Sequence, residues 1–386
     1  MEVYILDDLL RRTSVLDRFE SMVWAERYSS YGDFEFVIHS TNETRKLLQT
    51  GTRLAITESD RVMEIKEVED KTDNEGRNIL SVKGLEILSM LDERVATDGF
   101  APTGDYPKWN ITGIPGDVMR TVVNQICVVG LLSAGDIIPH LQMGSIYPPD
   151  TIPEPTVSIT AEFDPQTVYA AIKSVADVYN LGFRIVRKQD LTELYFDVYT
   201  GDDKTTLQTL NPAVIFSPTL NNLSNTTELT TTKNMKNVAY VFAKNDSKIV
   251  YAEGVDPTVS GFERRVLVVK ADDLTDPAGP SLTAQMQKKG LDELAKYRPT
   301  SAFDGEVSQL GSYRYGVDYN LGDLVEMRNT DGVTNIMRVT EQIFASDAQG
   351  DRSYPTLSVD RLITPGSWEA YGTGTWDDAL GHWDDL

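Results

Sequence analysis

Hydrophobic and polar positions alternate through most of residues 1–95, which is the pattern of β-strands with one buried face. The stretch from Phe19 to Ile38 predicts a hairpin, because its second half places Phe34 and Phe36 on one side and Gly32 can turn without steric cost. Further strands are predicted at residues 3–7, 53–58, 62–72 and 77–84. Short strands at this spacing are typical of a small β-barrel.

In four segments the hydrophobic residues recur with the period of an α-helix instead of alternating with polar ones. Helices are predicted at residues 84–94, at 115–132, from Pro165 to near Gly182, and at 281–297. In the third helix Asp164 is the expected N-cap and Pro165 the first helical residue. Later strands are predicted at residues 193–201, 237–246, 248–254, 263–273 and within 301–363. This order predicts a β-rich α+β fold class, with strands first, a mixed middle, and strands again.

The length of 386 residues suits roughly two to four domains. Hydrophobic residues make up 40% and charged residues 25% of the chain, as in folded globular proteins. The longest apolar run, residues 126–132, is too short for a membrane helix, and the amino terminus shows no export signal. We therefore expect a folded chain without a membrane anchor. Its single cysteine is consistent with synthesis in a reducing cytoplasm.

Acidic residues outnumber basic ones by 59 to 36, which gives a formal net charge of −23. A polyphosphate partner is repelled by such a charge at long range, so tight nucleic-acid binding is disfavoured. The simplest explanation of the acidity is that it keeps the protein soluble. A more specific explanation is an acidic surface along which DNA passes without binding.

Motifs of common enzyme chemistries are absent from the sequence. His39, His140 and His382 lie far apart and outside any HExxH motif, and no GxSxG elbow or glycine-rich phosphate loop occurs. Cys127 lies in an apolar run, where a buried structural thiol is a more frequent role than a pair with His140. We predict no catalytic residue, no cofactor site and no metal ligand. A glycosidase-like carboxylate pair stays open, because 59 acidic residues offer many candidates.

Tryptophans recur in the acidic carboxy-terminal tail. Trp-Asp-Asp occurs at residues 376–378 and again at 383–385, a spacing of seven that would align Trp376 and Trp383 on one helical face. Together with Trp368 they are predicted to dock onto a partner. The alternative is that the end of the chain simply packs against the rest of the protein.

Five blocks of the sequence carry a family resemblance. They are LDRFESMVWAERYSSYGDFEFVI (16–38), LLQTGTRLAI (47–56), VMEIKEVEDKTDNEGRNILSVKGLEILSMLDER (62–94), YRYGVDYNLGDLVEMRNTDG (313–332) and RVTEQIFASDAQGDRSYPTLS (338–358). In order and spacing these blocks resemble the siphovirus minor tail proteins that act as tail hubs in long-tailed bacteriophages. The resemblance extends from Val3 to about Leu362.

The resemblance implies an architecture similar to the central baseplate hub of contractile-tailed phages. Such a hub is a homotrimeric ring in which each subunit offers two related β-barrels, so that three-fold symmetry mimics six-fold symmetry. The domains implied by this analogy are a first barrel (1–95), an α+β middle domain (96–215), a second barrel (216–364, formed by 216–270 with 302–364) around a helical insertion near 271–301, and the tail (365–386).

The implied role is structural, in the tail tip of the virion. The ring would join the hexameric tail tube or the distal tail protein ring to the tail tip and would line the DNA conduit. Implied partners are these rings, the tape measure protein, tail-tip or receptor-binding proteins, and DNA that passes without tight binding. About twenty residues after the last barrel are too few for a hydrolase domain, so the tail is interpreted as a docking peptide or a partial channel plug.

Two alternatives stay open at this point. One is a tail-tip hydrolase of the host cell wall that uses a carboxylate pair. The other is a host carbohydrate-binding adhesin, because tryptophan and tyrosine rings stack on sugars.

Overall fold

The computed structural model describes residues 1–72, 76–99, 108–188, 192–244, 246–252, 254–271, 274, 282–297, 300–307, 313–328 and 334–359. The chain divides into two compact units. Unit 1 consists of Met1–Thr227 and Asp304–Leu386, and unit 2 of Glu228–Phe303. None of the helices in the described ranges is long and apolar enough to cross a membrane.

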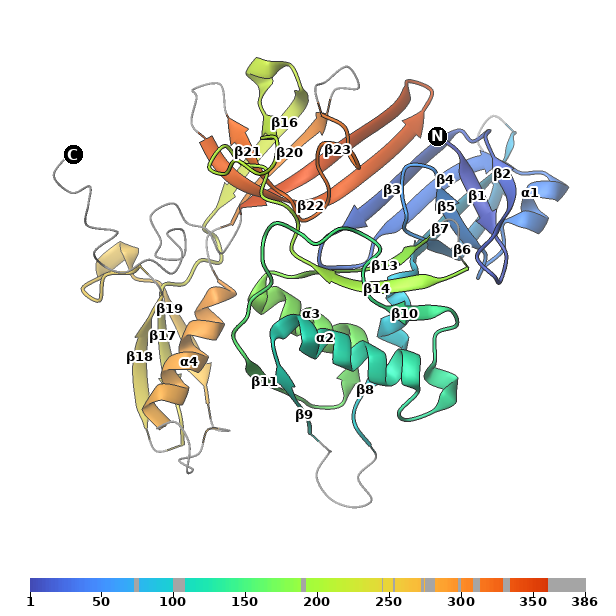
Figure 1. The fold of residues 1–386 in the computed structure, drawn as a ribbon. Helices are drawn as coiled ribbons and strands as arrows, with labels where there is room; N and C mark the ends of the chain where they lie inside the picture. The colour runs from blue at the N-terminus through green and yellow to red at the C-terminus, as the bar shows by residue number, and fades with distance from the viewer. Residues whose placement is uncertain are drawn as a thin grey trace. The chain divides into compact units, whose positions relative to one another are not determined.

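The largest sheet has thirteen strands in the order β16-β20-β23-β22-β3-β4-β7-β6-β5-β1-β2, and β21 attaches β15 to β22 (Figure 1). No pairing among the described strands joins β16 to β2, so this path is open at both ends. The strands are β1 (Val3–Leu6), β2 (Arg12–Leu16), β3 (Ser21–Arg27), β4 (Asp33–His39), β5 (Arg53–Ile56), β6 (Met63–Thr72), β7 (Asn78–Glu86), β15 (Ile215–Phe216), β16 (Leu223–Thr231), β20 (Thr300–Val307), β21 (Leu324–Arg328), β22 (Thr334–Asp347) and β23 (Gly350–Val359).

The predicted opening hairpin is confirmed as the antiparallel pair β3–β4. Phe34, Phe36 and Ile38 are buried on one face of β4, as their alternation predicts. Trp24 on β3 lies opposite Phe34, with the ring centroids 5.8 Å apart. These side chains belong to a core under the amino-terminal strands, and a short helix, α1 (Asn42–Leu47), follows β4.

Strands from the two ends of the chain meet where β3 pairs antiparallel with β22 (Figure 1). This pairing continues the amino-terminal strands directly into the hairpin of β22 and β23. Phe344 of β22 packs in the same core as the amino-terminal strands. One sheet therefore joins the first and last sequence blocks of the chain.

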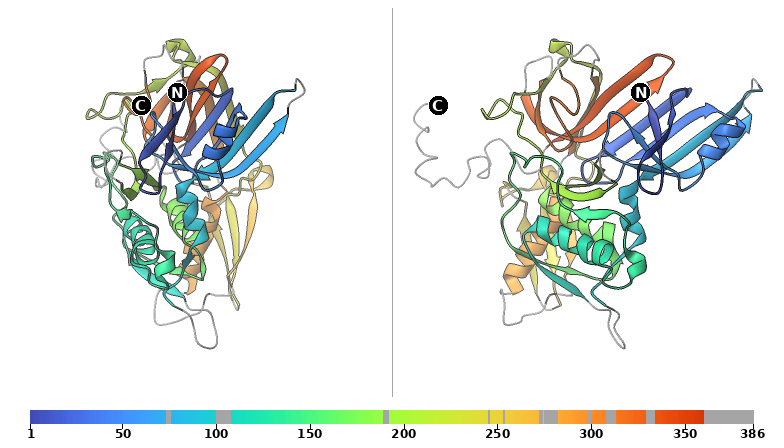
Figure 2. Two further views of the ribbon diagram at one scale, coloured as in Figure 1. Left: turned by 90° about the vertical axis from the view of Figure 1, so that its right-hand side faces the viewer. Right: turned by 45° about the vertical axis from the view of Figure 1, so that its right-hand side comes forward.

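Two helices lie side by side beneath this sheet in unit 1, α2 (Pro115–Val123) and α3 (Val168–Tyr179) (Figures 1 and 2). Their apolar faces share one core with strands β13 and β14. The smaller strands of this region are β8 (Val95–Ala96), β9 (Trp109–Gly113), β10 (Leu141–Met143), β11 (Ile159–Phe163), β12 (Gln166–Thr167), β13 (Gly182–Arg187) and β14 (Leu194–Tyr199).

The prediction of one helix over residues 84–94 is wrong in its first part. β7 continues to Glu86, since Gly84 and Leu85 still pair with β6, and only Ile87–Glu93 turns as a 3-10 helix, η1. The pairing of β7 with β6 overrides the local helical period. The predicted helix at 115–132 is α2 continued by a π-helical turn, η2 (Asn124–Val129), which ends at Gly130 with φ of 73°.

The predicted start of α3 is also wrong. Asp164 and Pro165 precede the helix, and Thr167 is the N-cap, with its hydroxyl accepting from the Ala170 amide at 3.1 Å. Gln166 and Thr167 pair with β8, so the chain turns helical only afterwards. The helix ends at Asn180 in the left-handed conformation, and Gly182 begins β13.

Unit 2 contains the sheet β18-β17-β19, with α4 on one side (Figure 1). Its elements are β17 (Val238–Phe242), β18 (Ser247–Tyr251), β19 (Val266–Lys270) and α4 (Leu282–Ala295), which confirms the three strands and the helix predicted here. Gly290 of α4 lets the helix approach closely, because a Cβ there would lie 2.8 Å from the Cβ of Val250.

Candidate functional site

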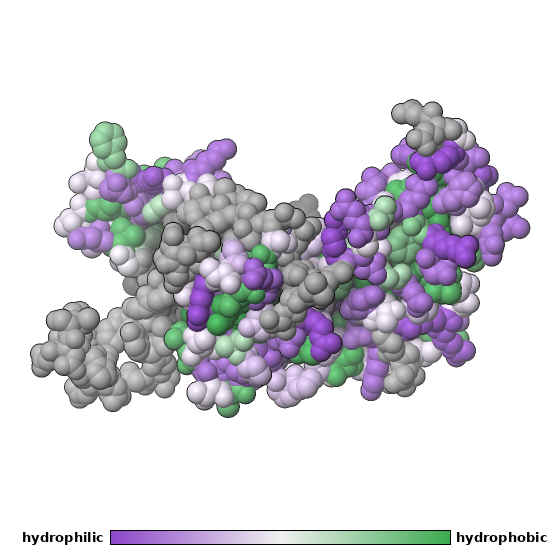
Figure 3. Space-filling view, turned by 90° about the horizontal axis from the view of Figure 1, so that it is seen from above, coloured by the Kyte–Doolittle hydropathy of each residue, from purple (hydrophilic) through white to green (hydrophobic). Residues whose placement is uncertain are grey.

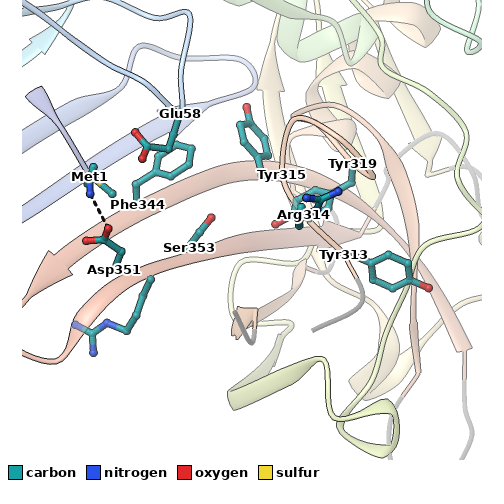
Figure 4. Close-up of a pocket in the computed structure, with 10 residues that line it drawn as sticks. Met1, Glu58, Tyr313, Arg314, Tyr315, Tyr319, Phe344, Asp351 and Ser353 are labelled. Carbon is teal, nitrogen blue, oxygen red and sulfur yellow. Dashed lines mark hydrogen bonds and ion pairs between the residues drawn. The ribbon is translucent and has the colours of Figure 1, made fainter. Parts of the chain in front are cut away.

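A pocket of about 320 Å³ lies where the loop 313–319 meets the hairpin of β22 and β23 (Figure 4). Its aromatic wall consists of Tyr315, Tyr319 and Phe344, with Tyr315 edge-on to Phe344 at 5.6 Å and to Tyr319 at 5.7 Å. The remaining lining residues are Met1, Glu58, Tyr313, Arg314, Asp351, Arg352 and Ser353. The pocket combines an apolar wall with a charged rim.

The tyrosines of this wall are anchored in the interior. The Tyr319 hydroxyl donates to Oε1 of Gln342 at 3.2 Å, and the Tyr315 hydroxyl donates to Oε2 of Glu26 at 3.3 Å. Their rings are thereby held in place where they line the pocket (Figure 4). A rigid aromatic wall of this kind can receive an apolar side chain or a sugar face.

Asp351 on the rim does not have the properties of the acid in a hydrolytic pair. Asp351 accepts hydrogen bonds from the Met1 amino group at 2.6 Å and from the Ser346 hydroxyl at 2.5 Å, and these bonds lower its pKa. A glycosidase needs one carboxyl group with a raised pKa to protonate the leaving oxygen. The shift at Asp351 is opposite to that requirement.

A buried ion pair lies deeper in unit 1, between Arg61 and Glu86. Nη1 of Arg61 lies 2.7 Å from Oε1 of Glu86, and Oε2 of Glu86 accepts from the Gly32 amide at 2.8 Å. Burial by itself lowers the pKa of Arg61, but Glu86 and the other groups around the guanidinium, Glu26 among them, together more than offset this, so the pKa is raised. Arg61 is thus held in its charged form.

A second buried acid, Glu26, lies close to this pair. The Trp24 indole donates to its Oε1 at 3.1 Å, and Tyr315 donates to its Oε2. Burial raises the pKa of Glu26, and the charge of Arg61 opposes this rise. We call Glu26, Arg61 and Glu86 the polar joint, because it connects β3, β7 and the loop before β6.

A group of aromatic and cationic side chains lies next to the polar joint, on the side of β14. Tyr28 and Tyr199 meet edge to face at 5.1 Å, and the Tyr28 hydroxyl donates to the backbone carbonyl of Asn180 at 2.9 Å. The Arg184 guanidinium lies 4.0 Å from the Tyr199 ring and forms an ion pair with Asp197 at 2.7 Å. All these polar groups have partners, so the arrangement holds elements together and presents no free reactive group among these side chains.

Of the remaining predicted candidates, the structure describes Cys127 but not the tryptophans of the tail. Cys127 is fully buried, and burial raises the pKa of its thiol to about 12, so the thiolate needed for a nucleophile is not populated near neutral pH. No group of three or more His, Cys, Asp or Glu in the described ranges could hold a metal ion. Trp368, Trp376 and Trp383 lie outside the described residues, as does His382.

Sequence reasoning missed both the pocket and the polar joint. A signal for the pocket was present, since three tyrosines occur within residues 313–319. No local pattern connects Arg61 with Glu86, because their pairing depends on the path of the backbone between them. The surface does not single out a binding site either. On the face shown in Figure 3, hydrophilic residues separate small hydrophobic groups.

Comparisons with known proteins add independent findings. The model of a family described as Siphovirus ReqiPepy6 Gp37-like protein matches residues 2–357. No curated protein sequence matches the chain. Among solved structures, the chain is similar to the tail protein from Neisseria meningitidis MC58, with a TM-score of 0.57 and 14% identity over 93% of this chain and 96% of that one.

A second similar structure is the 43 kDa tail protein of prophage MuSo2 from Shewanella oneidensis. Its TM-score is 0.55 at 12% identity, and the alignment covers 92% of this chain and 97% of that one. At such identities the likeness concerns the fold.

Proposed function

The chain belongs to the Siphovirus ReqiPepy6 Gp37-like protein family, a family of siphovirus tail proteins, and we propose that it acts as the tail hub of a long-tailed bacteriophage. As a member of this family it is a structural protein of the virion tail. The match over residues 2–357 carries the proposal, because it includes both strand-rich segments and the helical layer between them.

In this proposal three copies form a ring that joins the tail tube or distal tail protein ring to the tail tip. Each copy contributes two barrel-like halves, residues 1–95 and 216–364, so that a trimer presents six similar elements to a hexameric tube. The continuous sheet supports this, because β3 from the first half pairs with β22 from the second and holds the two halves at a fixed spacing. The tape measure protein and tail-tip proteins are the remaining proposed neighbours.

The proposed ring also lines the path of the DNA. Unit 2 carries eleven Lys and Arg residues and ten Asp and Glu residues, so the excess of acidic residues lies in the remainder of the chain. An acidic lining releases no counterions from DNA and therefore does not hold it. This charge distribution supports a conduit formed by unit 1.

The protonation and hydrogen bonding of the candidate catalytic groups favour a structural role over catalysis. The Cys127 thiol is protonated, the pKa of Asp351 is lowered, and Glu26 is satisfied by donors inside the core. A zymogram on host cell wall tests the alternative directly: a cleared band produced by the purified chain would favour a hydrolase.

The aromatic wall of the pocket favours one second candidate, a carbohydrate-binding adhesin. Binding of the isolated chain to whole host cells or to a glycan array would support it.

The tryptophans Trp368, Trp376 and Trp383 remain proposed docking residues in either case. Loss of tip assembly or infectivity after deletion of residues 366–386 is the expected result, and full infectivity without them would remove this assignment.

The hub proposal is tested by native mass spectrometry of the purified chain over a concentration series, with light scattering as a check. We expect a species of three times 43.0 kDa. A monomer that persists at every concentration and also fails to bind isolated tail tubes would overturn the proposal.

A further inference from the structure

A loop of unit 1 between β14 and β15 presents two leucines to solvent. Leu207 is 78% and Leu210 83% exposed. Exposed apolar side chains that occur singly need no explanation, whereas grouped ones mark interaction surfaces. No charged residue occurs between Lys204 and Glu228, although 25% of the whole chain is charged. We call residues 205–211 the leucine loop.

Hydrogen bonds inside the leucine loop fix its conformation. Oε1 of Gln208 accepts from the amides of Leu210 at 2.6 Å and of Asn211 at 2.8 Å. Nε2 of Gln208 donates to the backbone carbonyls of Thr205 and Asn211, both at 2.9 Å. The Asn211 side chain donates in turn to the Asp203 carbonyl at 2.9 Å. The Gln208 side chain therefore closes the loop around itself.

Hydrogen bonds to β21 fasten the base of the leucine loop to the large sheet. The Thr206 amide donates to Oε1 of Glu326 at 2.7 Å, and Glu326 is buried. The Lys204 amide donates to the Leu324 carbonyl at 2.8 Å. Because the loop is held in this way before any partner arrives, binding through its two leucines loses little conformational entropy.

The aromatic pocket of unit 1 has the size and chemistry to receive a leucine side chain (Figure 4). Its wall consists of the rings of Tyr315, Tyr319 and Phe344. An apolar cavity of about 150 Å³ can hold benzene, so a pocket of about 320 Å³ has room for a leucine side chain, which has fewer carbon atoms. Since the leucine loop is uncharged, its insertion removes no charge of its own from water.

We propose that the leucine loop of one copy inserts Leu207 and Leu210 into the aromatic pocket of a second copy. Both side chains are exposed in the single chain, so they do not fill the pocket of their own copy. The loop and the pocket consist of different residues, so the contact is heterologous, and such a contact closes into a ring when its rotation allows. This inference deepens the proposed hub and rests on it for the number of copies: in a ring of three, each copy gives one leucine loop and receives one.

Substitution of both leucines is the first test. In the double variant Leu207→Asp with Leu210→Asp, the concentration at which half of the chain is trimeric should rise at least about tenfold, because carboxylates would enter an apolar pocket. Native mass spectrometry over a concentration series measures this change. The control variant Leu131→Asp with Val157→Asp alters side chains that are 44% and 70% exposed elsewhere in unit 1, and it should assemble as the unmodified chain does. The melting temperatures of both variants must match that of the unmodified chain.

Disulfide crosslinking is the second test. Leu210→Cys places a thiol on the leucine loop and Ser353→Cys places one in the pocket, while the native Cys127 is buried. When the two single variants are mixed under oxidising conditions, we expect a covalent dimer in larger amount than either forms alone. A chain that carries both substitutions should yield a covalent trimer on a non-reducing gel. Leu131→Cys mixed with Ser353→Cys is the matched control and should not crosslink.

The outcomes separate this contact from the hub function. A trimer that assembles equally well without the two leucines would refute the contact and leave the hub proposal intact. A covalent dimer without the covalent trimer would support the contact and refute the three-fold ring. Crosslinking is carried out with and without isolated tail tubes, and absence of the mixed dimer in both conditions, or a disulfide formed within one chain, would refute the contact.

Discussion

Trp24 on β3 lies directly opposite Phe344 on β22, although the two residues come from opposite ends of the chain. Trp24 is 0% and Phe344 3% exposed. Both belong to the same core, where Phe344 also contacts the ring of Tyr315 at 5.6 Å. This contact fastens the amino-terminal strands to the carboxy-terminal hairpin, and it connects that junction to the wall of the pocket.

Phe344→Ala should destabilise unit 1 strongly. Removing a buried phenylalanine leaves a cavity and loses contacts, which costs about 3–5 kcal/mol of unfolding free energy. Chemical denaturation monitored by circular dichroism measures the change. Val317→Ala, at a residue 63% exposed on the loop beside the pocket, is the matched control and should change stability by less than about 0.5 kcal/mol.

Arg61→Met should destabilise the chain by about 3–5 kcal/mol, because it leaves the Glu86 carboxylate buried without its cation. The double variant Arg61→Met with Glu86→Gln should recover part of the loss, since glutamine is neutral and still accepts from the Gly32 amide. Lys71→Met removes one partner of the exposed Lys71–Glu69 pair and should cost at most about 1 kcal/mol. Equal effects of Arg61→Met and Lys71→Met would refute the importance of the polar joint.

Gly290→Ala should destabilise unit 2 despite the better helix propensity of alanine. The new methyl group would meet Val250 at 2.8 Å and Val241 at 2.9 Å, and overpacking of this kind costs about 1–3 kcal/mol, more than the helix gains. Hydrogen exchange of amides in β17 and β18 should accelerate. Thr283→Ala, on the exposed side of the same helix, provides the comparison, and unchanged exchange in Gly290→Ala would contradict the close packing of α4.

Stability should fall as the pH rises from about 4 to 7. Burial raises the pKa of Asp323 from an ordinary value of 3.8 to about 7, although the amides of Asp202 and Asn320 donate to its carboxylate. In this pH window the folded state holds a proton that the unfolded state has released, so the free energy of unfolding decreases with rising pH.

Asp323→Asn removes this titration, so its free energy of unfolding should change less steeply over the same window. Urea denaturation at pH 4, 5, 6 and 7 gives the two slopes. Asp8→Asn, at a fully exposed side chain, should keep the slope of the unmodified chain. Identical slopes for the unmodified chain and Asp323→Asn would show that Asp323 ionises normally in the folded state.

Much of the local structure followed from side-chain pattern. The hairpin of β3 and β4, the strands of unit 2 and helix α4 were predicted from their periods, and the structure confirms them. Predictions failed where pairing with a distant strand competed with a local preference. Gly84 and Leu85 stayed in β7 because β6 supplies hydrogen-bond partners, and Thr167 displaced Asp164 as the N-cap because β12 pairs with β8 first.

The sequence by itself determined which segments alternate, which turn helical, and that the chain is acidic with few reactive groups, because these properties depend on residues close together along the chain. Only the tertiary structure decided that β3 pairs with β22, that Arg61 meets Glu86, and that the loop 313–319 closes one side of a pocket. The physical reason is that backbone hydrogen bonding and burial act between segments whatever their separation in sequence. Their partners are therefore selected by the path of the folded backbone.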